Sequence, residues 1–539
     1  MRWTPITVGL IVCATAAGCG GSSRHHHVPP RHNHASAPGV VVAGTLVSTG
    51  ARYRWLVSTA GAQPTVAVEN RHPGTTAWRL PGPARDIGGL ATGNIGGYVA
   101  RQAIGVGETE RIYVSAPGSR TVRIRIFRMG WYGGLGGREV LTSGALRLRA
   151  QPRCTHRLQT GLTECAWHPT LSFAIPSALP SGVYIAKLSA RTGQSDCLFV
   201  VLAARRAPLL AQLPTSTYEA YNAWGGDSLY PGGKRVGITR STQGIEVSYQ
   251  RPYATNTGAG QFFARDVAMV RFLERYGYPV SYTTSESVDR DPGQLAGHRA
   301  AIDLGHSEYW SQRQAAAFAR ARDSGTSLLF FGSDTLAWRV RYAPASRATD
   351  DPGAPGQTII AYKEHARLDP DRSQPTGLFP DGGAGLTGSA YVGCITPRVK
   401  QPGAPTYRYY TWSARPNRRL GWLFAGTGMT SLTRIPGIVG YELDMRTPNS
   451  PPNTQVIGSG SVPCMDTEVG EPAPGRGQDL AQATLYTARS GALVFSTGTL
   501  GWELGLEPVP SASPNAPAWP NSHLVAITRN LLAHVLAHR

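Results

Sequence analysis

The stretch Ala300–Trp310 (AAIDLGHSEYW) most narrows what this chain can fold into. Its mostly apolar first part, Ala300–Leu304, ends at Gly305, and a helical pattern follows over Gln312–Arg322. A short buried strand that stops at a glycine and leads into a helix is typical of open α/β sheets. Ligands in such sheets bind beyond the carboxyl ends of the strands. We therefore expect a functional site among the reactive side chains of His306–Trp310.

Strands and helices alternate on both sides of this stretch. The expected elements are strands at Leu209–Leu213, Val280–Tyr282, Ser327–Phe331 and Gly491–Ser496, and helices at Phe262–Tyr276 and Ser522–His538. Such alternation indicates βαβ units and a parallel sheet. The sequence therefore predicts an α/β domain over residues 206–539, interrupted by a β-rich insertion at about 340–480, where the sequence is rich in Pro and Gly and weakly periodic.

Residues 40–205 show the pattern of short strands. In Thr121–Phe127 (TVRIRIF), apolar residues alternate with arginines, which indicates a strand with one buried face. Further strands are expected at Arg111–Val114, Ser172–Ile175 and Val183–Leu188. Several strands of this kind predict a β-sandwich of immunoglobulin-like type. The glycine-rich loop 128–138 (RMGWYGGLGGR) is expected to pack on the neighbouring domain.

The N-terminus carries the features of an export signal. Its apolar run, Ile6–Ala17, is too short for a permanent transmembrane helix. The run ends in AAGC, which resembles a bacterial lipoprotein cleavage site, although Ala16 stands where leucine is usual. The resemblance implies a signal peptide over 1–19, lipidation of Cys19 and a flexible tether over 20–38. We expect an exported protein that this lipid anchors to the cell membrane, with ordinary secretion as the alternative.

Export permits disulfide bonds, and the cysteine spacing suggests two. Cys154 and Cys165 flank a predicted hairpin, and Cys394 with Cys464 would close a longer loop. Cys197 lies in an apolar run and is expected to be a buried thiol. Because no C-x-x-C spacing occurs, we do not expect a structural zinc site.

The formal net charge of the chain is +20. A basic balance favours acidic partners, either nucleic acid or the acidic polymers and lipid headgroups of a cell envelope. The chain has no block of Lys and Arg interleaved with aromatic residues and no recognisable nucleic-acid-binding motif. We therefore expect an envelope protein without a nucleic-acid partner.

The residues after Gly305 admit three chemical interpretations. GHSEY nearly matches the G-x-S-x-G elbow of serine hydrolases, with Ser307 as nucleophile, but Tyr309 replaces the glycine that lets the helix pack closely. Alternatively, His306 and Glu308 lie two residues apart, on one side of an extended backbone, and both can serve a metal site. A tyrosine phenolate is a plausible third ligand for ferric iron. The simplest interpretation is a capped helix start with a buried polar pair.

Several motifs, in one order, extend the comparison beyond this stretch. They are IFRMGWYGGLGGREV, YEAYNAWGGDSLY, RPY with GAGQFF, LERYGYPVSYTT, LGHSEYWS and FFGSDTLAWRVRY. Together they resemble the large (β) subunit of N,N-dimethylformamidase, and more closely the broad bacterial family that shares its C-terminal domain. The resemblance covers residues 95–340 well and 491–506 more loosely. It implies a β-sandwich followed by a glutamine-amidotransferase-like (flavodoxin-like) α/β domain.

The family enzyme holds one iron through two tyrosines and a glutamate, with a histidine and an asparagine nearby. Carried over to this chain, the glutamate matches Glu308 and the histidine matches His306. One tyrosine matches Tyr221 in YNAWGG, and the other is assigned to Tyr184 in SGVYIAKL on position alone. The asparagine position is occupied by Asp334, which adds negative charge beside the site.

The function that this resemblance implies is iron-dependent hydrolysis of C–N bonds in small linear amides, with His306 or Asp334 moving the proton. The alternatives are a non-catalytic surface lipoprotein that retains the fold, and a metal-free serine hydrolase that uses Ser307. The family enzyme also has a small partner subunit. The sequence leaves open whether such a subunit, or a further copy of this chain, joins the protein.

Overall fold

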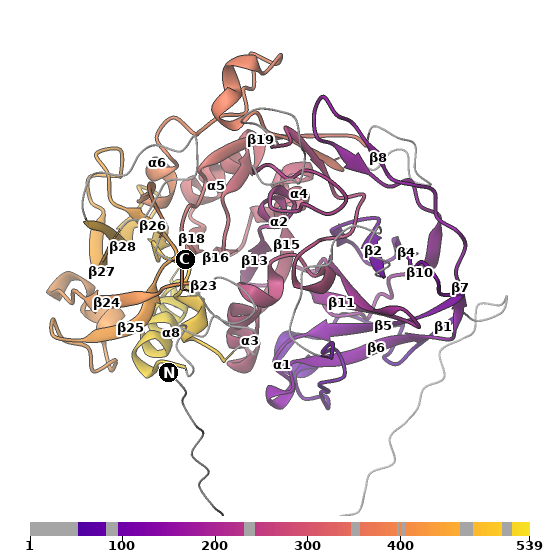
Figure 1. The fold of residues 1–539 in the computed structure, drawn as a ribbon. Coiled ribbons are helices and arrows are strands. Elements are labelled where there is room, and N and C mark those ends of the chain that lie inside the picture. Colours follow the sequence, from indigo (N-terminus) through magenta and orange to yellow (C-terminus); the bar gives the residue numbers. More distant parts are fainter. Residues whose placement is uncertain are drawn as a thin grey trace, which may run out of the picture. The chain divides into compact units, whose positions relative to one another are not determined.

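The computed structural model describes residues 52–81, 95–230, 243–345, 356–395, 398–399, 406–463, 478–508 and 520–538, without the side chains of 256, 392–407, 463 and 478–479. All of them belong to one compact unit, Gly44–Arg539. The expected signal peptide, Cys19 and the tether lie outside the described residues. So does the predicted Cys394–Cys464 pairing. The described part confirms a mixed α/β chain that is rich in strands, with several sheets and few helices (Figure 1).

The first part of the described chain forms two packed sheets, which are antiparallel except where β12 pairs with β3. The larger sheet has the order β1-β6-β5-β11-β12-β3, with β7 beside β5, and the smaller has the order β10-β4-β2. The larger sheet consists of β1 (Tyr53–Trp55), β6 (Gly137–Ser143), β5 (Thr121–Met129), β7 (Leu146–Arg147), β11 (Gly182–Ala190), β12 (Gly193–Val201) and β3 (Ala103–Ile104). The smaller consists of β10 (Pro169–Ala174), β4 (Thr109–Ser115) and β2 (Gly96–Val99).

The alternation in the sequence accounts for the core between these sheets. In β5, Val122, Ile124 and Ile126 are buried, whereas Arg123 is exposed and Arg125 only partly covered. The buried side chains pack against residues of the smaller sheet. The prediction from the TVRIRIF pattern is confirmed.

The second part contains a nine-stranded sheet with the order β15-β13-β16-β18-β29-β28-β27-β24-β25. The first five strands are parallel: β15 (Val280–Thr284), β13 (Leu209–Leu213), β16 (Ala300–Leu304), β18 (Ser327–Phe331) and β29 (Leu493–Ser496). The last four are antiparallel: β28 (Gln478–Thr487), β27 (Gln455–Pro463), β24 (Tyr410–Ala414) and β25 (Arg434–Val439). The residues predicted as a β-rich insertion thus extend the same sheet.

Helices cover both faces of the parallel strands. Alternate strand residues such as Leu209 and Leu210 belong to different apolar clusters, one shared with α3 (Val267–Arg275) and α8 (Ser522–Ala537), the other with α5 (Gln312–Asp323). Parallel strands need this double cover, because both of their faces are apolar. The remaining helices are short: α1 (Val66–Glu69), α2 (Thr215–Ala220), α4 (Ser285–Arg290), α6 (Ala384–Thr387) and α7 (Gly421–Phe424).

Smaller sheets complete the described fold. One of four strands has the order β14-β20-β19-β17, with bounds β14 (Glu246–Ser248), β20 (Thr358–Ile360), β19 (Trp338–Ala343) and β17 (Tyr309–Ser311). Three strand pairs join β21 (Ala390–Ile395) to β26 (Glu442–Met445), β22 (Arg398–Val399) to β23 (Thr406–Tyr407) and β8 (Thr155–His156) to β9 (Thr163–Glu164). Within the described ranges, no helix combines the length and apolar character needed to cross a bilayer.

An ion pair ties the two-sheet part to the parallel sheet. Arg128 of β5 donates from Nη1 and Nη2 to the two carboxylate oxygens of Glu274 of α3, each at 2.8 Å, and both side chains are fully buried. The predicted packing role of the glycine-rich loop is confirmed, since Arg275 of α3 lies 4.7 Å from the ring of Trp131. The boundary near residue 205 stays a prediction.

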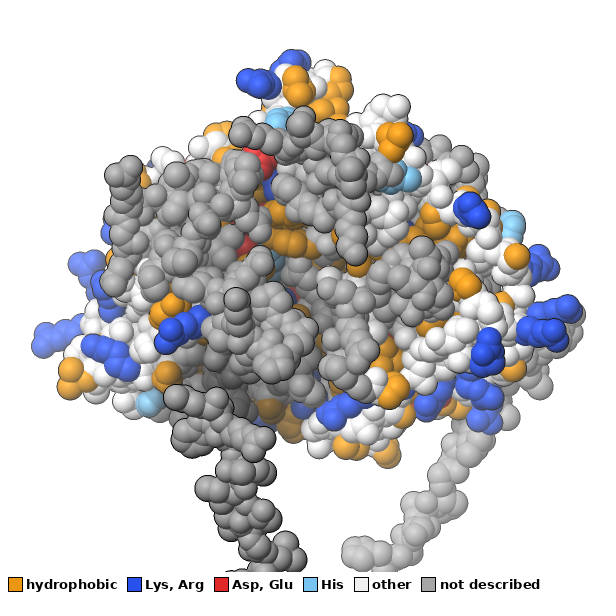
Figure 2. All heavy atoms as spheres, viewed as in Figure 1, with side chains coloured by type: hydrophobic (Ala, Val, Ile, Leu, Met, Phe, Trp, Pro, Cys, Tyr) orange, Lys and Arg blue, Asp and Glu red, His pale blue; other side chains and the backbone are white. Residues whose placement is uncertain are grey.

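Two of the expectations about the cysteines are confirmed, and the Cys394–Cys464 pairing stays a prediction. Cys154 and Cys165 form a disulfide across the β8–β9 hairpin, and Cys197 is a buried free thiol. On the face of the molecule that Figure 2 shows, Lys and Arg side chains are spread over the described surface and do not gather in one patch.

A buried carboxyl in the two-sheet part makes stability depend on pH. Burial raises the pKa of Glu110 from 4.5 to about 8. Between these two pH values the unfolded chain has released a proton that the folded chain keeps. The contribution of Glu110 to stability is therefore complete below pH 4.5 and is lost as the pH rises towards 8, at about 1.4 kcal/mol for each pH unit. We expect Glu110→Gln to lose less stability between pH 5 and pH 8, as measured by urea unfolding. Equal losses in both proteins would contradict the assignment.

Candidate metal centre

The site lies where β16 and β18 end, at the carboxyl edge of the parallel strands. Gly305 turns the chain directly after β16 with a φ of +53°, which glycine adopts without strain. A β-carbon at Gly305 would collide with the Asp266 carboxylate, and one at Gly332 would collide with the Gly305 carbonyl. Two glycines therefore allow the ends of neighbouring strands to approach closely. The predicted position of the site is where reactive side chains do gather.

The Glu308 carboxylate is the centre of this group. Its side chain is fully buried. The Tyr221 hydroxyl donates to Oε2 at 2.9 Å, and the Tyr230 hydroxyl donates to Oε1. The two tyrosine rings stack with centroids 4.3 Å apart. Two phenol oxygens, from partly buried tyrosines, thus converge on one fully buried carboxylate.

His306 joins Glu308 to a second carboxylate. Its Nε2 lies 3.4 Å from Glu308 Oε2 and 2.8 Å from Glu442 Oε2, and its Nδ1 lies 3.4 Å from the Tyr441 hydroxyl. Glu442 is the first residue of β26, far along the chain. Two carboxylates thus lie against one ring nitrogen of a buried histidine, and a tyrosine hydroxyl faces the other. Catalytic and metal-binding histidines are oriented by neighbours of this kind.

Asp334 completes the group from the turn after β18. Its φ is +55°, a conformation that aspartate tolerates better than most residues, and its backbone N–H donates to Asp444 Oδ1 at 2.6 Å. Burial raises the pKa of Asp444 to about 7. Atoms of His306, Asp334 and Glu442 lie within 4.8 Å of one another, so these three buried side chains could hold a metal ion.

A buried cation lies beside the tyrosine pair. The Lys363 ammonium is 3.7 Å from the Tyr230 ring centroid and 4.9 Å from that of Trp338, and the residue is only 3% exposed. An ammonium over aromatic rings is attracted by their faces.

The structure does not bring Tyr184 to this site. Its hydroxyl donates to the Pro180 carbonyl at 2.6 Å, and its ring stacks on Phe199 in the core between the two sheets. Burial raises the pKa of Tyr184 far above its usual value. The assignment of Tyr184 as a ligand is therefore corrected, because Tyr184 lies in a different core, and the second tyrosine beside Glu308 is Tyr230.

The Ser307 hydroxyl also turns away from a catalytic arrangement. It donates to Asp303 Oδ1 at 3.0 Å and accepts a bond from the Trp310 indole. In the Ser-His-Asp triad, a histidine hydrogen-bonded to the serine hydroxyl acts as its base. The adjacent His306 ring instead faces Glu308 and Glu442.

Of the residues singled out from the sequence, the structure brings His306, Glu308, Tyr221 and Asp334 together, and their role stays a prediction. Tyr230, Glu442 and Lys363, which lie beside them, were not singled out. Tyr230 was within reach, because it ends the motif YEAYNAWGGDSLY that opens with the Tyr221 segment. Glu442 and Lys363 lie in the region read as an insertion, where nothing in the local pattern marks them.

The described residues also line a surface hollow of about 570 Å³, but at the opposite end of the parallel strands. Its lining includes His298 and Arg299, which precede β16, and Thr326, which precedes β18. None of the clustered residues above lines it. The clustered reactive side chains therefore lie outside this hollow, and we assign the site from these side chains.

Comparisons with known proteins bear on these residues. A family model described as N,N-dimethylformamidase beta subunit-like, C-terminal, matches residues 123–517. No curated protein matches the chain. Among solved structures, a carbohydrate acetylesterase from Xanthomonas citri is aligned over 74% of this chain and 95% of its own, at 10% identity and a TM-score of 0.12. A likeness this weak carries no argument about fold or function.

The tyrosine hydroxyls should support the buried Glu308 charge even without metal. We expect Tyr221→Phe and Tyr230→Phe each to lower the free energy of unfolding of chelator-treated protein by about 1–3 kcal/mol, because a buried carboxylate loses a donor. In a double-mutant cycle, the effect of Tyr230→Phe should shrink when Glu308→Gln is already present. Equal effects in both backgrounds would show that the hydroxyl does not act through Glu308.

Proposed function

Since the chain belongs to the N,N-dimethylformamidase beta subunit-like, C-terminal family, we propose that it is an iron-dependent hydrolase of C–N bonds in small linear amides. One observation carries the proposal. Two tyrosine hydroxyls and a histidine meet at a single buried glutamate, Glu308, at the carboxyl edge of the parallel strands. We further propose that the two-sheet part is immunoglobulin-like and the parallel sheet glutamine-amidotransferase-like.

The donor set suits the proposed metal. Tyr221, Tyr230 and Glu308 would hold the iron, because phenolate and carboxylate oxygens are hard ligands of the kind that ferric iron accepts. The hydroxyl oxygens of the two tyrosines already lie against the Glu308 carboxylate. Bound iron would supply Lewis-acid polarisation of the amide carbonyl and a water that ionises near neutral pH. His306, Asp334 and Glu442 adjoin this set and would face the reacting amide.

His306 and Glu442 form the proton-transfer pair in this proposal. Their Nε2 and Oε2 atoms lie 2.8 Å apart, so the two side chains can share one proton. The pair takes a proton from the attacking water as the water oxygen bonds to the carbonyl carbon. It returns a proton to the amide nitrogen as the C–N bond breaks, which releases a carboxylic acid and an amine. Asp334 is the second acid within reach.

Lys363 would balance charge in the same site. Two phenolates and three carboxylates form an excess of negative charge in a buried space, and burying unbalanced charge is costly. The Lys363 ammonium, 3.7 Å from the Tyr230 ring centroid, offsets part of it. The chemistry of the site thus favours a small neutral amide over an anionic substrate.

We also propose that the protein is exported and lipidated at Cys19, on the AAGC sequence that ends the apolar N-terminal run. Substitution of Cys19 by serine should abolish labelling of the chain by a radioactive fatty acid in the producing cell. Persistent labelling would place the lipid elsewhere.

The central test is iron content together with hydrolysis of a small N-alkylated formamide, followed as amine release. We expect Glu308→Ala to lose both, with activity falling more than about 100-fold, because the ligand set loses its carboxylate. Tyr230→Phe should also lose iron, whereas Tyr184→Phe should keep iron and rate. If Glu308→Ala kept its iron and its rate, the proposal would be wrong.

A second variant separates proton transfer from metal binding. Glu442→Gln should lower kcat by about 100- to 10,000-fold and leave iron content unchanged, because it removes the partner of the His306 proton. Loss of iron in this variant would instead assign the metal to His306, Asp334 and Glu442.

A further inference from the structure

The segment that carries the two tyrosines has little regular structure of its own. Tyr221 caps the C-terminus of α2, and Tyr230 follows nine residues later, after turns and bends. No strand or helix pairing fixes residues 222–230. Contacts other than regular secondary structure must therefore hold this segment so that both hydroxyls meet at Glu308.

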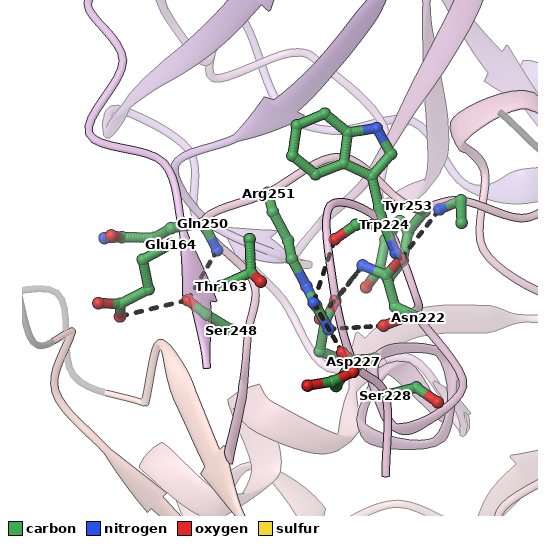
Figure 3. Close-up of polar contacts among 12 residues, drawn as sticks. Thr163, Glu164, Asn222, Trp224, Asp227, Ser228, Ser248, Gln250, Arg251 and Tyr253 are labelled. Atoms are coloured by element: carbon green, nitrogen blue, oxygen red, sulfur yellow. Dashed lines mark hydrogen bonds and ion pairs between the residues drawn. The ribbon is translucent and has the colours of Figure 1, made fainter. Parts of the chain in front are cut away.

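Arg251 is the side chain that does so. Its guanidinium is fully buried, and its Nε donates to Glu219 Oε1 of α2 at 2.8 Å. The remaining donors reach three backbone carbonyls of the segment: Nη2 reaches Asn222 at 2.6 Å, and Nη1 reaches Trp224 at 3.2 Å and Asp227 at 3.1 Å. Figure 3 shows these carbonyls converging on the guanidinium.

Asn222 closes the same arrangement from the other side. The Asn222 side-chain Nδ2 donates to Glu219 Oε2 at 3.1 Å and to the Pro252 carbonyl at 3.0 Å. Its side-chain Oδ1 accepts from the backbone N–H groups of Trp224 and Ala254. Pro252 follows Arg251 directly. Five hydrogen bonds thus join the segment to residues 251–254, three from Arg251 and two through the Asn222 side chain. The Leu229 N–H also donates to the Ala220 carbonyl of α2 at 2.8 Å.

The chemistry of arginine suits this role. A guanidinium stays charged when buried and offers its donors in a planar fork, which lysine cannot copy. Burial raises the pKa of Glu219 to about 8, and Arg251 opposes that shift. A buried charge pair is weak evidence for stability alone, but it can fix one geometry. Here the other N–H groups of Arg251 donate to backbone carbonyls between Tyr221 and Tyr230.

We propose that Arg251 is the positioning residue of the tyrosine pair: it fixes residues 222–230 so that Tyr221 and Tyr230 present their hydroxyls to one carboxylate. The inference rests on the proposed function for its consequence, iron binding. Arg251 itself touches neither Glu308 nor the other side chains of the site. It acts through the segment that it holds.

A matched pair of variants tests this role. Arg251→Lys keeps the charge and loses the fork. Arg128→Lys makes the same change at another fully buried arginine, which pairs with Glu274 and also donates to a backbone carbonyl, that of Ser181, away from the tyrosines. We expect both variants to unfold at lower urea concentration. Only Arg251→Lys should speed backbone hydrogen exchange across residues 222–230 in metal-free protein.

Iron binding gives the second measurement. Arg251→Lys should weaken iron binding by about 10- to 100-fold, as loss of a group that orients ligands does, and Arg128→Lys should leave it within about twofold. If the two variants changed exchange at 222–230 equally, Arg251 would have no positioning role. If wild-type protein bound no iron but the exchange difference appeared, the proposed function would fail while Arg251 still positioned the segment.

Discussion

The convergence of Tyr221 and Tyr230 on the Glu308 carboxylate is the interaction on which the rest of this structure depends. A fully buried carboxylate is tolerated only where hydrogen bonds or opposite charge compensate for lost water. Here the neighbours of Glu308 come from different parts of the chain: two tyrosines that precede β16, and His306 directly after it. Lys363, which follows β20, contacts the ring of Tyr230. The site therefore forms only when the fold brings these side chains together.

The fold divides this work between rigid and irregular parts. The parallel strands β16 and β18 place Glu308, His306 and Asp334 at one edge, and two glycines let the strand ends approach. The tyrosines come from an irregular segment that Arg251 and Glu219 hold in place.

The two-sheet part supports the same segment. Trp224, within it, packs edge-on against Trp167 with ring centroids 5.9 Å apart, in a small apolar cluster with Cys165 of the disulfide. The N-terminal part of the chain thus helps to hold the segment that carries the two tyrosines.

Sequence reasoning succeeded where local pattern determines structure. The alternation in Thr121–Phe127 and the apolar run before Gly305 specified their strands, because burial on one face or both is written into neighbouring residues. It directed attention to Glu308 because that residue follows a strand end, and the structure places other reactive side chains around it. It did not single out Glu442, which contacts His306 from β26, after the chain has added β24 and β25 to the sheet. It placed Tyr184 wrongly, because position in the chain says nothing about which face of a strand meets a core.

The most direct test of the account is the visible absorption spectrum of the purified wild-type chain, taken with its iron content. The account predicts about one iron per chain and a broad tyrosinate-to-iron absorption band, which Tyr230→Phe should lose or shift and Tyr184→Phe should leave unchanged. A protein with stoichiometric iron but no such band, or one that binds no iron when it is supplied, would contradict the claim that Tyr221, Tyr230 and Glu308 form a metal centre.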